Sequence, residues 1–334
     1  MNLPAVDPVV ELIDRARASG LDPELLAPIF ERFVTIARRH AALERAVLGS
    51  VPLSFPAHLL EGSAAVTDPL AGGASLASRE RERLGGDPAV LDRLERILED
   101  QGVKVVSLTF PAGSSLLSAF VFHSDTGPAI LVDAANFRRE RDYALAHAYG
   151  HYLADHDPWH AWTCRTGGGG DSIEELRAHG FAGALLVPEA ALTDYLAAVP
   201  PALKRPVSAD LVRQLRVYFE ADDRAILGRL LALGHITTSE IAPLMAGLAP
   251  VEGDPSADTE GSGAGGMFRG EGHDIAEGLS DRYVTLAVMA HRAGQLDTAG
   301  LARALETDES TALAIDGRFR REETGEEEDG QRTH

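Results

Sequence analysis

Two histidines are spaced so that they could bind one metal ion. His147 and His151 are four residues apart in the segment 137–155, where we expect a helix. At this spacing both imidazoles project from one face of the helix, about one turn apart. A helix presents two nitrogen ligands to a single zinc ion in this way. The pair therefore predicts a metal site, although two histidines also occur at this spacing by chance.

The residue that follows His147 determines which chemistry such a site can perform. In the metallopeptidase pattern His-Glu-x-x-His, the glutamate is the general base that takes a proton from the attacking water. This chain has Ala148 at that position, and a methyl group cannot accept a proton. Loss of a general base typically lowers a rate about 10²–10⁴-fold. The two predicted ligands are present and the base is missing.

The segments around the histidines predict an α+β arrangement. Helices are expected over 87–102 and over 172–187, before and after the histidine-bearing helix. Short strands are expected at 103–110, 119–122 and 129–132. Residues 125–127, Asp-Thr-Gly, are typical of a hairpin turn between the last two strands. The order helix, three strands, helix, helix is typical of an α+β fold. The strand over 119–122, or its neighbour, would offer an edge on which an extended peptide could pair.

Two motifs in this part of the chain resemble the ImmA/IrrE family of zinc metallopeptidases. The first family motif, (F/Y)-x-L-A-H-E-x-G-H, is matched at Tyr143, Leu145, Ala146, His147, Gly150 and His151. The second, E-x-x-A-N-x-F-A-x-x-L-L-x-P, is matched at Glu175, Ala178, Phe181, Ala182, Leu185, Leu186 and Pro188. The resemblance covers about 87–192, and it extends more loosely to 280–282 and 293–302.

The resemblance implies a small zincin-like peptidase core, with a short β-sheet and a His-Glu-x-x-His-type helix, embedded in a mainly helical protein. It also implies Zn²⁺ as the cofactor, with His147, His151 and Glu175 as the metal ligands. Glu175 lies beside Glu174, so a solvated helix face is the alternative for this residue. Ala148 occupies the position of the catalytic glutamate.

Further residues are candidates for the surroundings of the metal. His179 stands where the family has asparagine, and it could orient a ligand, lie on the surface or be an extra ligand. His179 and Tyr149 are expected beside the ligands or in the cleft. Asp157, ten residues after His147 as in metzincins, is a rival third ligand, although Ala154 occupies the position of their turn-forming glycine.

The resemblance implies a zinc-dependent endopeptidase that cuts a protein, typically a helix-turn-helix repressor, in a stress, DNA-damage or phage-defence response. Two accounts of Ala148 remain open. In the first, the glutamate of an otherwise active enzyme was deliberately replaced by alanine, to trap the state with metal or substrate bound. In the second, the chain is a natural pseudopeptidase that binds a repressor or DNA without cutting. We prefer the first account because the rest of the motif is retained. In either case the enzyme is expected to be inactive or strongly impaired.

Composition excludes several other classes of protein. The net charge of −20 disfavours a nucleic-acid binder, because phosphate contacts need a basic face. No run of 18 uncharged apolar residues is present, so no membrane span is expected. The single cysteine, Cys164, excludes a disulfide framework and a cysteine-based zinc cluster, and it suits a reducing cytoplasm. Cys164 could reach the zinc and regulate it by oxidation, or it could simply be a packing residue.

The chain divides into segments of different composition. We expect N-terminal helices over 1–50, a connector over 51–86 and the metallopeptidase core over 87–200. A helical module that resembles a helix-turn-helix should follow over 201–250, and it could equally pack on the core. The remaining segments are a flexible linker over 251–274, C-terminal helices over 275–316 and a disordered acidic tail over 317–334.

Overall fold

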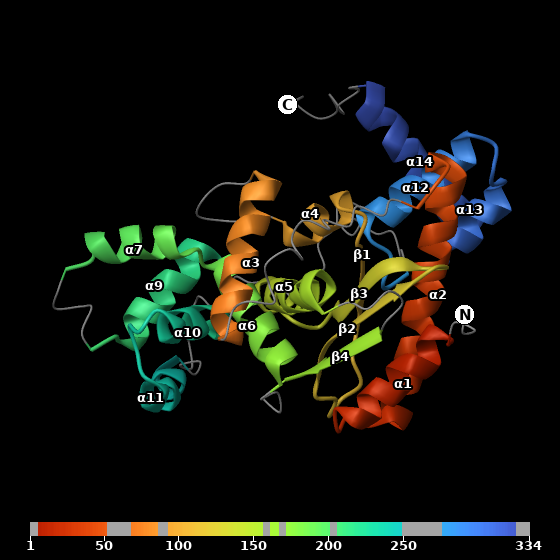
Figure 1. Cartoon of the computed structure of the whole chain (residues 1–334). Helices are drawn as coiled ribbons and strands as arrows, with labels where there is room; N and C mark the ends of the chain where they lie inside the picture. Colours follow the sequence, from red (N-terminus) through yellow and green to blue (C-terminus); the bar gives the residue numbers. More distant parts are fainter. Residues whose placement is uncertain are drawn as a thin grey trace.

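The computed structural model describes residues 6–51, 68–85, 93–155, 161–166, 172–200, 206–248 and 276–324. These residues form a small mixed sheet surrounded by helices, which confirms the α+β class (Figure 1). Among them, no single helix is both long and apolar enough to cross a membrane. Only α6 (Ile173–Leu186) and α7 (Glu189–Ala198) taken together, a pair bent by 54°, meet those criteria.

The sheet has four strands in the order β1-β3-β2-β4. The strands are β1 (Lys104–Leu108), β2 (Leu116–His123), β3 (Gly127–Asp133) and β4 (Ala161–Arg165). β1 pairs with β3 in parallel, and the other pairs are antiparallel. The three predicted strands are confirmed, as is the hairpin turn, which joins His123 to Gly127.

We expected a sheet edge at the strand over 119–122 or at its neighbour. It is not β2, because β2 is hydrogen-bonded on both sides. The edge on this side is its neighbour β4, a strand that the sequence analysis did not predict. Its neighbours 156–160, which include the proposed ligand Asp157, lie outside the described residues.

Side chains alternate between the two faces of the sheet, as the strand period of two requires. Phe120, Ile130 and Val132 belong to the hydrophobic core beneath α5 (Arg138–Ala154), the predicted histidine-bearing helix. Ala119, Val121 and Leu131 belong to a second core on the other face. There the sheet meets the N-terminal helices α1 (Pro8–Ala18) and α2 (Pro23–Leu48). Both helices begin at an Asp-Pro pair, in which the side chain of Asp7 or Asp22 caps the first turn.

The interval 51–86 is not simply a connector, because residues 69–84 form helix α3 (Pro69–Leu84). This helix packs tightly along α6 (Ile173–Leu186) (Figure 1). The backbones touch at two glycines: a Cβ on Gly73 would overlap the carbonyl oxygen of Arg177, and a Cβ on Gly180 would overlap that of Leu70. Helix α3 also reaches α5, since Tyr149 donates its hydroxyl to buried Glu80 at 2.6 Å. Tertiary packing thus stabilises a Gly- and Ser-rich helix that has weak intrinsic propensity.

The remaining helices lie around this core. Of the helix expected over 87–102, the structure describes α4 (Leu94–Asp100), and residues 87–92 lie outside the described residues. The three helices of the 201–250 module are α9 (Ala209–Phe219), α10 (Asp223–Ala232) and α11 (Thr238–Leu248). The other helices are α7 (Glu189–Ala198), α12 (Asp281–Arg292), α13 (Thr298–Leu305) and α14 (Glu309–Thr324).

Two of these helices test the division of the chain that was expected from its composition. Helix α10 packs against α6, so the 201–250 module is attached to the peptidase core. Helix α14 continues to Thr324, so the tail expected from residue 317 begins no earlier than 325. The expected linker over 251–274 lies outside the described residues.

Candidate metal centre

Helices α5 and α6 bring the three predicted ligands together. His147 and His151 are fully buried on α5, with ring centroids 5.0 Å apart. The Glu175 carboxylate of α6 lies between them: Oε2 is 3.4 Å from His147 Nε2, and Oε1 is 3.4 Å from His151 Nε2. Two ligand atoms that are each roughly 2.0–2.1 Å from a tetrahedral zinc are about 3.3 Å apart. The spacing therefore fits a shared metal ion.

The buried histidines also have unsatisfied nitrogen atoms. Nε2 of both residues and Nδ1 of His147 have no hydrogen-bond partner among the described residues. Burying an unpaired polar atom costs free energy, and buried polar groups are normally hydrogen-bonded or bound to metal. A metal ion between these rings would satisfy both Nε2 atoms.

A fourth donor completes the group. Cys164 of β4 lies with its thiol in the same cluster, and one donor atom from each of the four residues lies within 4.8 Å of the others. From the lone cysteine we expected no cysteine-based zinc cluster, yet Cys164 lies in a mixed group of donors that could hold a metal ion. Two imidazoles, a carboxylate and a thiol are ligands that zinc accepts.

Two neighbouring residues hold the ligands in place. Asp155, at the C-terminal end of α5, lies 2.7 Å from His151 Nδ1 and also pairs with Arg177 of α6. Trp162 of β4 donates its Nε1–H to Glu175 at 3.2 Å and stacks on the His151 ring, with centroids 4.9 Å apart. Such contacts orient metal ligands and fix the histidine tautomer.

The two other predicted site residues lie in different places. His179 is outside the four-residue group; its Nδ1 is 2.8 Å from the Tyr143 hydroxyl, and its ring is 4.5 Å from that of His147. His179 therefore lies next to His147, at the border of the cluster. Tyr149 does not reach the cluster or a cleft. It points to α3 and packs on Phe181, because it lies two residues, about 200° of helix turn, from both histidines.

The surroundings of the two histidines shift their pKa values in opposite directions. Burial, together with the neighbouring ring of His151, holds the pKa of His147 well below its ordinary value, so this imidazole is neutral. Burial opposes charge on His151 too, but its contacts with Cys164, Asp155 and Glu175 outweigh that effect and raise its pKa well above the ordinary value. The metal-free cluster thus favours a proton on His151, and a metal ion would compete with that proton.

The position of the catalytic glutamate is occupied by the buried methyl group of Ala148. Ala148 is fully buried and belongs to the hydrophobic core beneath the sheet. Its side chain supplies no group that can hold or transfer a proton.

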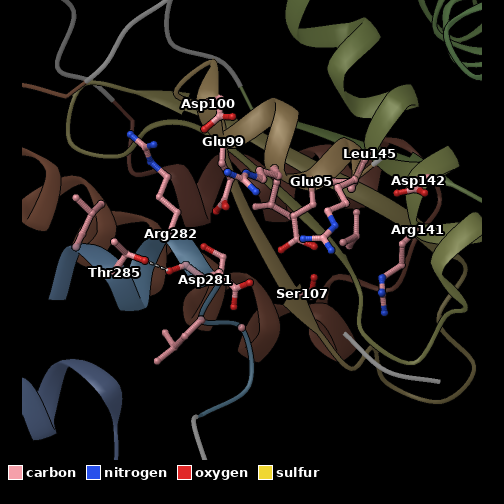
Figure 2. A pocket seen from close by; sticks show the side chains of 18 of the residues that line it. Glu95, Glu99, Asp100, Ser107, Arg141, Asp142, Leu145, Asp281, Arg282 and Thr285 are labelled. Atoms are coloured by element: carbon pink, nitrogen blue, oxygen red, sulfur yellow. Dashed lines mark hydrogen bonds between the residues drawn. The ribbon is translucent and has the colours of Figure 1, made fainter. Parts of the chain in front are cut away.

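A large cavity lies elsewhere in the molecule. Its volume is about 900 Å³, and α4, β1, α5 and α12 supply most of its lining. Figure 2 shows acidic and basic side chains facing it together, among them Glu95, Glu99, Arg141 and Arg282. None of the four cluster residues lines this cavity, which lies beside β1 at the opposite edge of the sheet from β4.

The small sheet, the helix with two histidines and the glutamate on the next helix form a zincin-like arrangement around a candidate metal site. Residues 98–226 match the family model of M78 peptidases, described as the IrrE N-terminal-like domain. This match confirms the resemblance to ImmA/IrrE metallopeptidases for the middle of the chain. No curated protein sequence matches the chain.

Proposed function

We propose that the chain is a zinc-dependent endopeptidase of the ImmA/IrrE type in a form that lacks the general base. Its substrate would be a protein, namely a helix-turn-helix repressor of a stress, DNA-damage or phage-defence response. The observation that supports this proposal is the convergence of His147, His151 and Glu175, whose facing atoms are 3.4 Å apart. The family match supports the reaction class.

Each residue of the cluster has a role in this proposal. His147, His151 and Glu175 would hold the zinc, and a bound zinc ion would polarise the scissile carbonyl and activate water. Asp155 keeps His151 in the tautomer whose Nε2 faces the cluster. Trp162 holds the Glu175 carboxylate in place. Ala148 cannot remove the proton from water, so hydrolysis by the chain as it stands should be slow.

The Ala148→Glu variant tests the proposal. It is incubated with zinc and with helix-turn-helix repressors from the same genome, and the fragments are identified by mass spectrometry. Ala148→Gln is the matched control, because it adds the same volume without a base. Since Ala148 is buried, the melting temperature of both variants must be measured. A folded, zinc-loaded Glu variant that cuts no repressor contradicts the proposal.

A second candidate function is stoichiometric binding without cleavage. The observation that favours it is the full burial of Ala148 in the hydrophobic core, which leaves the position packed rather than open to a substrate. The unmodified chain would then form a stable complex with the repressor, which size-exclusion chromatography would detect. Direct DNA binding is disfavoured by the net charge of −20 and by the packing of α10 against α6.

A further inference from the structure

The alternation of side chains along β4 determines which way the thiol of Cys164 points. Along β4, residues 162 and 164 face one side and residue 163 the other. Trp162 marks the first side, because it contacts both Glu175 and His151. Thr163 marks the second side, because its hydroxyl lies 3.4 Å from that of Ser19, just after α1. Cys164 is therefore directed toward the metal cluster.

The position of Cys164 is not explained by apolar packing alone. Its sulfur lies in a group whose other members include unpartnered histidine nitrogens, and the residue is only 2% exposed. Four ligands of one zinc ion lie roughly 3.3–3.7 Å apart in a tetrahedron. The donor atoms here lie within 4.8 Å of one another, so an inward shift of about 1 Å would bring all four to one ion.

We propose that Cys164 is a fourth protein ligand, so that this chain holds zinc in a closed site made by His147, His151, Glu175 and Cys164. The proposal rests on the proposed zinc site and adds a fourth protein ligand to it. Zinc sites that catalyse hydrolysis keep one position open for water or substrate, whereas structural sites have four protein ligands. A thiolate in the fourth position agrees with the absence of a base at Ala148. Both features would make the chain as it stands retain the metal and hydrolyse peptide slowly.

Cobalt substitution tests the proposal without any need for hydrolysis. The apo chain is titrated with Co²⁺ and its absorption spectrum is recorded. A thiolate ligand should give a sulfur-to-cobalt charge-transfer band in the near ultraviolet, with the intense visible bands of tetrahedral cobalt. The Cys164→Ala variant should lose the charge-transfer band. Its zinc affinity should fall by at least the roughly 10–100-fold that loss of a residue supporting a ligand costs.

Thr163→Ala is the matched control, because Thr163 is buried on the same strand and its hydroxyl faces Ser19 on the other side of the sheet. It removes a hydroxyl next to Cys164 in the sequence and no proposed ligand, so the band should remain. A proton count gives a second measurement: calorimetry in two buffers should show more protons released on zinc binding by the unmodified chain than by Cys164→Ala.

The outcomes separate this proposal from the proposed function. Stoichiometric cobalt binding without the charge-transfer band, and with unchanged affinity in Cys164→Ala, would overturn Cys164 as a ligand while leaving the three-ligand site. Failure of the unmodified chain to bind cobalt or zinc at all would overturn both. Failure of Ala148→Glu to cut a repressor concerns the proposed function alone, since the spectrum reports ligation.

Discussion

The Nδ1 atom of His151 lies 2.7 Å from a carboxylate oxygen of Asp155, one turn further along at the end of α5. The other oxygen of Asp155 pairs with Arg177 on α6. A single buried carboxylate thus fixes the orientation of a proposed ligand on one helix and ties it to the helix that carries Glu175. The ring of His151 cannot rotate without breaking this contact.

Replacing Asp155 should weaken metal binding without removing a ligand. In Asp155→Asn the charged acceptor for Nδ1–H is lost, so the ring is held less firmly and its Nε2 is less basic. We expect zinc affinity to fall about 10–100-fold, measured by competition with a chromophoric chelator. Asp194→Asn, an exposed change on α7, is the control. Equal zinc affinity in the two variants would contradict the role given to Asp155.

The unmodified chain should bind one zinc ion despite Ala148, because the base is not a ligand. Elemental analysis should give about one zinc per chain, and removal by a chelator should lower the melting temperature, since a ligand that binds only the folded state stabilises it. His147→Ala should abolish the stoichiometric zinc. His235→Ala, between α10 and α11 and outside the cluster, should retain it.

The contact between α3 and α6 predicts that alanine at two glycines of α6 changes the free energy of unfolding in opposite directions. In Gly180→Ala the new methyl group would overlap the Leu70 carbonyl, so the helices must separate, at a cost of about 1–3 kcal/mol. In Gly183→Ala the nearest atom is 3.8 Å away, and the gain in helix propensity is up to about 1 kcal/mol. Urea unfolding of both variants checks this difference. Equal midpoints would show that the helices do not meet at Gly180.

The cavity beside β1 should make stability depend on pH through Glu99. Burial raises the pKa of this carboxyl to about 8, with the nearby Glu95 adding to the effect. The folded state therefore keeps a proton that the unfolded chain releases near its ordinary pKa of 4.5. The resulting stability is present below about pH 4.5 and is lost as the pH rises to about 8.

Glu99→Gln should remove this pH dependence, because glutamine stays neutral. Between pH 5 and pH 8 the urea midpoint of the variant should fall less than that of the unmodified chain. Glu31→Gln, an exposed change on α2, should leave the pH profile unaltered. A variant profile parallel to that of the unmodified chain would show that Glu99 is ionised in the folded protein at neutral pH.

The parts of the structure that follow local rules were predictable from the sequence. Helix α5 and its two histidines, the hairpin at residues 125–127, and the helix that starts at Ser172 all carry their own spacing, turn or capping signals. Helices α9, α10 and α11 also lie within the helical module that was expected over 201–250.

The parts that were missed depend on contacts between distant residues. Helix α3 contains two adjacent glycines, which reduce helix propensity, and one of them, Gly73, allows the close contact with α6. Strand β4 is short and forms only by pairing with β2. Because β4 was not expected, the place of Cys164 beside the histidines could not be predicted from spacing. Tyr149 was placed wrongly because adjacency in sequence to the histidines does not put a side chain on their face of the helix.

Helix α3 lies ahead of residues 98–226, yet it covers α6 and supplies the acceptor for the buried Tyr149 hydroxyl. A fragment limited to residues 98–226 would therefore expose the side of α6 that carries Gly180 to water. It would also leave the buried Tyr149 hydroxyl without Glu80, the acceptor that α3 supplies. A shortened version of this chain that keeps the metal cluster should accordingly begin before α3, at residue 68 or earlier.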